Sequence, residues 1–266
     1  MILFNNAPEE IFTSIYNIVI KDLVVYSHNK NSMCIIKKFL IYRKNTQDKY
    51  KENFIKLRSK LEEEAYNILN SHYGNYLFHT IIQSWEDDEL IPISHIVIPH
   101  SIELAKHIHA SSTIERLISR EGTGFNYLFL SKIHKENYVE ELIFDKHSKF
   151  VIKESILSSM NCSDPNIKYL FKELMSEIKY SLKLNKHTND QAKSSLLDFW
   201  INFFREIKIN LKEIHSRKTS LSGFKLLNIS NLMNTSSLYY DKSFNNAGYI
   251  QVPISSIQMY PSISYK

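Results

Sequence analysis

One layout recurs four times within residues 23–157 of this chain. Each copy has an apolar segment with helical spacing, a short polar stretch, a compact five-residue motif and a second apolar segment. The four motifs are Met33-Cys34-Ile35-Ile36-Lys37, Asn75-Tyr76-Leu77-Phe78-His79, Ser111-Ser112-Thr113-Ile114-Glu115 and Lys149-Phe150-Val151-Ile152-Lys153. Their first residues are separated by 42, 36 and 38 positions. Because a period near 38 residues is typical of stacked helical units, the repeat predicts a helical solenoid.

Helical periodicity agrees with this prediction and argues against sheet-containing folds. Apolar residues follow i, i+3, i+4 spacing over residues 54–69, 167–178 and 196–211, whereas no segment alternates with period two for long. The chain has five glycines in 266 residues, fewer than Rossmann sheets, phosphate-binding loops or β-sandwiches use in their turns. Asp164 and Pro165 indicate a helix start, with an N-cap followed by proline at the first helical position. We therefore predict an all-α chain.

The repeats predict one helical domain over residues 1–215, with about four repeats and C-terminal capping helices. Residues 1–20 are expected to cover the first repeat, and the apolar side chains expected to pack inward are Phe4, Ile11, Phe12, Ile15 and Ile18. Alternatively, the chain is a fragment, or its open end meets a partner. Residues 43–60 form a basic insertion between the first two repeats. Residues 216–266 are rich in Ser, Asn and Tyr, which predicts a loosely ordered tail.

Composition bounds the class of protein. Hydrophobic residues make up 43% of the chain and charged residues 23%, an ordinary globular balance. Cys34 and Cys162 are too few for a disulfide framework or a four-thiolate zinc site. No apolar run approaches the roughly 18 residues that a membrane helix needs, and the start of the chain lacks a signal-peptide pattern. We expect a cytoplasmic protein with no membrane partner.

No catalytic or metal-binding motif is evident. His95, His100, His107 and His109 cluster in the sequence, but no nearby cysteine or acid completes a metal-binding set. Residues 122–124 (Gly-Thr-Gly) lack the lysine of a phosphate-binding loop. HExxH, GxSxG and the kinase motifs do not occur. We therefore expect no enzyme activity, cofactor or metal.

Two of the repeats resemble a known kind of solenoid. The stretch His72-Tyr73-Gly74-Asn75-Tyr76 resembles the start of the RNA-binding helix in PUF (Pumilio-family) repeats. Residues 103–117 resemble the penultimate repeat of that family, with its histidine, its alanine-serine step and its isoleucine-glutamate pair. The four repeats are thus similar to the C-terminal half of a PUF domain, over about residues 11–215. This resemblance implies a right-handed, crescent-shaped superhelix of three-helix repeats, in which each second helix contacts one RNA base.

The resemblance also implies a role for each motif position. The first and fifth residues, which lie on one helix face, contact the base edge, and the second residue stacks between bases. The implied base-edge residues are Asn75, His79, Ser111, Glu115, Lys149 and Lys153. The implied stacking residues are Tyr76, Ser112 and Phe150. Met33, Cys34 and Lys37 are the weaker candidates in the first repeat, where no base code is evident. The third and fourth motif residues are expected to point inward.

Each motif implies a different base preference. Ser111 with Glu115 implies guanine, because a carboxylate can accept from the guanine N1–H and N2–H₂ edge. Asn75 is typical of uracil-binding repeats, but His79 replaces the usual glutamine and offers only one donor or acceptor, which weakens the uracil preference. Lysines 149 and 153 have no acceptor and favour phosphate over a base edge.

Two functions remain open at this point. The resemblance implies sequence-selective binding of single-stranded RNA, with a UGU-like element in mRNA 3′ untranslated regions (3′ UTRs) as target and the deadenylation or repression machinery as partner. No DNA binding is expected, and a net charge of +5 permits a polyanionic partner. The alternative is a degenerate helical-repeat scaffold that binds proteins, or structured RNA by charge alone. In that case Asn75 begins a helix, Tyr76 and Phe150 pack, and the lysines are solvated.

Overall fold

The computed structural model describes residues 9–42 and 51–218, and no strand occurs in these two ranges. The helices that precede the second repeat are α2 (Glu9–Lys21), α3 (Leu23–Ser27), α4 (Lys30–Tyr42) and α5 (Lys51–Glu63). The second and third repeats contain α6 (Ala65–Leu69), α7 (Asn75–Ser84), α8 (Asp87–Val97), η2 (Ile98–His100), α9 (Ser101–Lys106), α10 (Ser111–Ser119), η3 (Glu121–Thr123) and α11 (Phe125–Lys135). The last helices are α12 (Val139–Ile143), α13 (Ser148–Asn161), α14 (Pro165–Leu184) and α15 (Gln191–Lys218).

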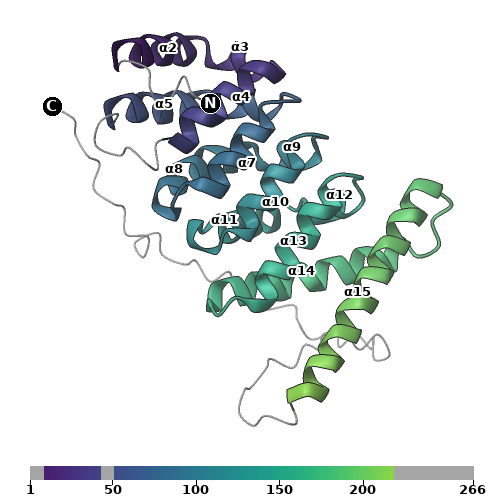
Figure 1. Ribbon diagram of the computed structural model, residues 1–266. Coiled ribbons are helices and arrows are strands. Elements are labelled where there is room, and N and C mark those ends of the chain that lie inside the picture. Colours follow the sequence, from purple (N-terminus) through teal and green to yellow (C-terminus); the bar gives the residue numbers. More distant parts are fainter. Residues whose placement is uncertain (1–8, 43–50, 219–266) are drawn as a thin grey trace. The chain divides into compact units, whose positions relative to one another are not determined.

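Each repeat contains three helices, and equivalent helices of successive repeats pack against one another (Figure 1). The second helices contact each other in the order α4, α7, α10 and α13, and the third helices in the order α5, α8, α11 and α14. Among the first helices, α3 contacts α6 and α9 contacts α12. The predicted all-α solenoid of three-helix repeats is therefore confirmed for the described ranges.

An apolar core runs between the helices of each repeat. The inward-pointing motif residues of the later repeats are fully buried, as predicted: Leu77, Phe78, Ile114, Val151 and Ile152. In the first repeat Ile36 is buried but Ile35 is exposed. Helix α4 packs against the second helix of the next repeat, and no second helix precedes it in the described residues. Helix α4 therefore has a neighbouring second helix on one side, whereas α7 has one on both sides, and this difference is consistent with the exposure of Ile35 and the burial of Leu77.

Helix α2 precedes the first repeat and packs against α5 and α3. Its Tyr16 is buried, whereas Ile11, Ile15 and Ile18 are 52%, 41% and 56% exposed. The prediction that these isoleucines pack inward is wrong. Positions i, i+4 and i+7 share one helix face, and Tyr16 lies on nearly the opposite face, which is the one that α2 buries. The side chains of Phe4 and Phe12 lie outside the described residues.

The C-terminal helices close the repeat array. Helix α14 begins as predicted, because the Asp164 carboxylate accepts from the Asn166 amide at 2.7 Å and Pro165 is the first helical residue. On α15, the buried Trp200 donates from its indole Nε1 to the Ile143 carbonyl oxygen at 2.9 Å. No helix in the described part of the chain is long and apolar enough to cross a bilayer.

Packing divides the chain into two units, Met1–Asn210 and Leu211–Lys266. The second unit is described only as far as the end of α15 at Lys218. The tail predicted for residues 216–266 therefore lies, from residue 219 onward, outside the described residues.

Candidate nucleic-acid interface

The four motifs occupy equivalent positions on the packed helices α4, α7, α10 and α13. In every repeat the second motif residue and the fifth are exposed or partly exposed, while the fourth is buried. We call the side chains at the second and fifth positions the motif surface. It consists of Cys34, Lys37, Tyr76, His79, Ser112, Glu115, Phe150 and Lys153.

Contacts between repeats join the first three motifs into one surface. The Lys37 Nζ lies 5.4 Å from the centroid of the Tyr76 ring, within cation–π distance. The Tyr76 and His79 rings meet edge to face with centroids 5.7 Å apart. His79 Nε2 then lies 3.2 Å from the Ser112 Oγ of the third repeat. The fifth residue of one motif thus contacts the second residue of the next.

The first motif residue lies beneath this surface in three repeats, where Met33, Asn75 and Ser111 are all buried. Asn75 donates from Nδ2 to the His109 carbonyl oxygen at 2.8 Å, while its Oδ1 is buried without a partner. The first motif residue is therefore buried in these repeats, whereas the fifth is partly exposed. The sequence had predicted that both contact the base edge. The base contacts of Asn75 and Ser111 stay predictions.

Glycine is required just before the second motif. A Cβ atom on Gly74 would lie 2.2 Å from the Ile68 carbonyl oxygen, a distance that no side chain tolerates. The Gly74 amide also donates to the Ser71 Oγ at 2.7 Å. This close approach shapes the short turn between the end of α6 at Leu69 and the start of α7, and so it sets the position of Asn75 and Tyr76.

Burial shifts the two titratable groups at the centre of the motif surface. It lowers the pKa of His79 to about 4, and the charges of Arg116 and Lys37 act in the same direction. Burial also raises the pKa of Glu115, with Glu154 adding to the effect and Arg116 opposing it. His79 is therefore uncharged at neutral pH.

Helix α15 covers part of the fourth motif. Lys149 Nζ lies 5.0 Å from the Phe150 ring centroid and 4.7 Å from that of Phe199, and Lys153 Nζ lies 5.3 Å from the Phe203 ring centroid. The Phe150 and Phe199 rings meet edge to face at 5.5 Å, yet Phe150 remains 43% exposed. Phe199 and Phe203 were predicted only as apolar residues of an amphipathic helix, not as neighbours of the fourth motif. Their only signal was the apolar spacing of residues 196–211, which indicates packing.

Histidines lie next to the motif surface, just before helices α7 and α10. A ring nitrogen of His72 lies 3.4 Å from the imidazole of His109. His107 Nδ1 accepts from the amides of His109 and Ala110, both at 3.3 Å, which gives it a structural role in the turn before α10. In the parts of the chain that the structure describes, no three His, Cys, Asp or Glu side chains are arranged to hold a metal ion.

The described part of the predicted basic insertion, residues 51–60, is not an insertion but lies on α5, the third helix of the first repeat. Its charge is partly neutralised by acidic residues of α5 and by Glu64 just after it. Arg58 pairs with Glu62 at 2.8 Å, and Lys60 pairs with Glu63 and Glu64 at 3.0 and 3.1 Å. Residues 43–50, which carry other cations of the insertion, lie outside the described ranges.

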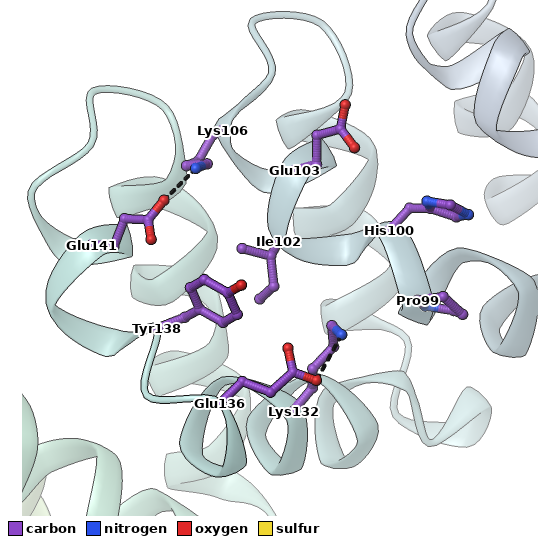
Figure 2. A pocket seen from close by; sticks show the side chains of 9 residues that line it. All are labelled: Pro99, His100, Ile102, Glu103, Lys106, Lys132, Glu136, Tyr138 and Glu141. Atoms are coloured by element: carbon purple, nitrogen blue, oxygen red, sulfur yellow. Dashed lines mark hydrogen bonds and ion pairs between the residues drawn. The ribbon is translucent and has the colours of Figure 1, made fainter.

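A pocket between α9, α11 and α12 lies outside the motif surface (Figure 2). It is lined by Pro99, His100, Ile102, Glu103, Lys106, Lys132, Glu136, Tyr138 and Glu141. Both of its lysines are ion-paired, Lys106 with Glu141 and Lys132 with Glu136. With three carboxylates against two lysines, the pocket does not favour a phosphate.

Solved structures with the same fold are PUF RNA-binding domains. A mutant of Puf4 bound to a Cox17 RNA 3′ UTR recognition sequence matches with a TM-score of 0.56 and 13% identity, over 78% of this chain and 58% of that one. PUF-8 in complex with PBE-RNA matches with a TM-score of 0.54 and 13% identity, over 79% and 58% of the two chains. The RNA-binding domain of yeast Puf5p bound to SMX2 RNA matches with a TM-score of 0.50 and 14% identity, over 76% and 60%.

This chain therefore has the helical-repeat fold of PUF domains and spans a little over half the length of these structures. No family model matches the sequence, and no curated protein sequence matches it.

Proposed function

We propose that this chain binds single-stranded RNA along the motif surface and selects among RNA sequences. The observation that carries the proposal is the shared register of the four motifs, which exposes the same two positions on four packed helices. The result is a row of aromatic, hydrogen-bonding and cationic side chains. Such a row suits unpaired bases, which stack on aromatic rings while cations neutralise the phosphates. The structurally similar Puf4 and Puf5p domains are themselves RNA-bound.

Each repeat contributes differently to the proposed site. Tyr76, exposed and beside Lys37, supplies a stacking ring in the second repeat. Glu115 supplies an acceptor in the third repeat, which suits the N1–H and N2–H₂ edge of guanine. Phe150 supplies a second stacking ring, and Lys149 beside it supplies charge for a phosphate.

The proposal extends to the kind of RNA and its role. The target would be a UGU-like element in an mRNA 3′ UTR, where the bound protein would recruit repression or decay machinery in the cytoplasm. The 3′ UTR target is supported by the structurally similar Puf3 and Puf4 domains, which are bound to 3′ UTR recognition sequences of Cox17 RNA.

A scaffold without base recognition is the second candidate. The observation that favours it is the burial of Asn75 and Ser111, together with the aromatic side chains of α15 that lie against Lys149 and Lys153. Such a protein would bind RNA through charge alone, or bind another protein.

A titration separates the two functions. The full chain is titrated with a labelled UGU-containing oligonucleotide and with a scrambled one, each at two salt concentrations. If two bases are contacted at their edges, and each contact contributes about 1–3 kcal/mol of binding free energy, the UGU sequence should be preferred by about 2–6 kcal/mol at most. Equal affinities that fall steeply with salt would support the scaffold.

Paired tyrosine variants test the location of the site. Tyr76→Ala should weaken binding to both oligonucleotides by about 1–3 kcal/mol, because stacking depends little on sequence. Tyr127→Ala is the matched control, since Tyr127 is similarly exposed but lies on α11, away from the motif surface. Equal effects of the two variants would contradict the proposed location.

A further inference from the structure

Ser112 and His79 meet at the junction of the second and third repeats. The Ser112 Oγ lies 3.2 Å from His79 Nε2 and 3.2 Å from the His109 carbonyl oxygen. A serine hydroxyl has one hydrogen to donate, and a carbonyl oxygen can only accept. Only one assignment turns both contacts into hydrogen bonds. In it, Ser112 Oγ donates to His109 and accepts from an N–H at His79 Nε2.

The His109 carbonyl oxygen fixes the direction of this chain of hydrogen bonds. It also accepts from Asn75 Nδ2 at 2.8 Å, so that its two lone pairs serve one donor from each of the two repeats. The Ser112 hydrogen is thereby directed toward the backbone of its own repeat. The Ser112 lone pair faces His79, in the preceding repeat.

The other ring nitrogen of His79 is then an acceptor. Burial keeps the pKa of His79 at about 4, so the imidazole is neutral near pH 7 and carries a single N–H. With that hydrogen on Nε2, Nδ1 presents a lone pair. No described residue hydrogen-bonds to Nδ1. A completely buried atom without a partner would be an unsatisfied polar atom, and Nδ1 is not among these. Nδ1 is therefore at least partly accessible from solvent at the motif surface.

We infer that Ser112 is a positioning residue that holds His79 in the Nε2–H tautomer, so that the second repeat presents a hydrogen-bond acceptor to an RNA base. This inference rests on the proposed RNA binding for its ligand, but its geometry belongs to the free protein. Uracil N3–H and guanine N1–H can donate to such an acceptor. At the same place on the base edge, adenine N1 and cytosine N3 are acceptors and would face it lone pair to lone pair. These two bases can donate only through their exocyclic amines, which lie at the end of that edge. The second repeat should therefore accept uracil or guanine and disfavour adenine and cytosine.

The tautomer can be measured without RNA. Two-bond ¹H–¹⁵N correlation spectra of the full chain near pH 7 distinguish an Nε2–H imidazole from an Nδ1–H one. We expect His79 to be Nε2–H in the wild type and in Ser112→Thr, which keeps the hydroxyl, and to become a mixture of tautomers in Ser112→Ala. An Nδ1–H tautomer in the wild type, or an unchanged tautomer in Ser112→Ala, would overturn the inference.

Ser119→Ala is the matched control. Ser119 is also on α10, and its Oγ donates to the carbonyl oxygen three residues earlier, that of Arg116, at 2.9 Å. The Ser119→Ala substitution therefore removes the same kind of hydroxyl from the same helix, but one that does not contact His79. We expect its His79 spectrum to match that of the wild type.

An RNA series tests the base selectivity. Four oligonucleotides that differ only at the base facing the second repeat are titrated against each variant. Uracil and guanine should bind about tenfold more tightly than adenine and cytosine, the effect of one hydrogen bond gained or lost. This ratio should fall toward one in Ser112→Ala and persist in Ser112→Thr. Binding without base preference would overturn the selectivity. An absence of all RNA binding, with the tautomer as expected, would refute the proposed function and leave the role of Ser112 standing.

Discussion

The side-chain amide of Asn75 donates from Nδ2 to the main-chain carbonyl oxygen of His109 over 2.8 Å. This bond connects the first residue of α7 in the second repeat to the turn before α10 in the third. Because Asn75 is only 4% exposed, water does not readily replace the bond when it is lost. The bond therefore helps to hold two neighbouring motifs in register.

Asn75→Ala should destabilise the fold. The expected loss in free energy of unfolding is about 1 kcal/mol, because losing the bond to His109 is partly offset by removing an Oδ1 that is buried without a partner. Denaturant unfolding followed by circular dichroism measures it. Asn67→Ala is the control, since Asn67 is exposed and its amide donates to Glu64 within the same repeat. Equal stabilities of the two variants would show that the Asn75 bond contributes nothing.

Glu115→Gln should separate recognition from stability. The amide can no longer accept from both guanine donors, so affinity for guanine-containing sites should fall by about 1–3 kcal/mol relative to other sites. The fold should be as stable as before or more so, because burial and Glu154 disfavour the Glu115 carboxylate and raise its pKa. Binding titrations and thermal unfolding test the two parts. Glu121→Gln, exposed in η3, should change neither, and an unaltered guanine preference in Glu115→Gln would rule out base contact.

His79 should make the fold sensitive to acid. Its folded pKa of about 4 lies below the ordinary histidine value of 6.5, because of burial and the charges of Arg116 and Lys37. Between these values the unfolded chain binds more protons, so the free energy of unfolding should fall as pH drops from 6.5 to 4. His79→Gln, which does not titrate, should make the urea unfolding midpoint depend less steeply on pH in this range. Since burial also lowers the pKa of His109, part of the slope should remain, but an unchanged slope in His79→Gln would place the acid sensitivity elsewhere.

The lysines of the fourth motif should contribute charge without sequence preference. Lys149→Gln with Lys153→Gln should weaken binding to all RNA sequences alike. If each lysine meets one phosphate, the slope of log affinity against log salt should become shallower by about 1.4. Lys172→Gln with Lys183→Gln, exposed on α14, is the matched control. An effect confined to one base would show that these lysines contact base edges.

Local patterns were sufficient to predict most of the helices. The apolar spacing, the repeat near 38 residues and the cap formed by Asp164 all depend on residues close in sequence, and the structure confirms the helices that they indicate. The apolar spacing over residues 54–69 continues across a break at Glu64, since Leu57 and Leu61 before it and Ala65 and Ile68 after it are all buried. The apolar spacing therefore predicted which residues are buried, but it did not predict that one helix ends and another begins at Glu64.

The details of the site depend on packing between repeats, which no local pattern contains. Asn75 meets His109, 34 positions away, and Lys149 meets Phe199 on a helix that follows the last repeat. The sequence placed Asn75 and Ser111 on the same helix face as His79 and Glu115. It could not show that neighbouring repeats cover the first position of each pair and leave the fifth partly open.

The most direct test of the account is photo-crosslinking of the full chain to a UGU-containing oligonucleotide with 4-thiouridine, followed by mass spectrometry of the crosslinked peptides. If RNA lies along the motif surface, crosslinks should fall on helices α7, α10 and α13, at or beside Tyr76 and Phe150. Crosslinks confined to α8 and α11, or to the pocket around Tyr138, would place the RNA on another face and contradict the account.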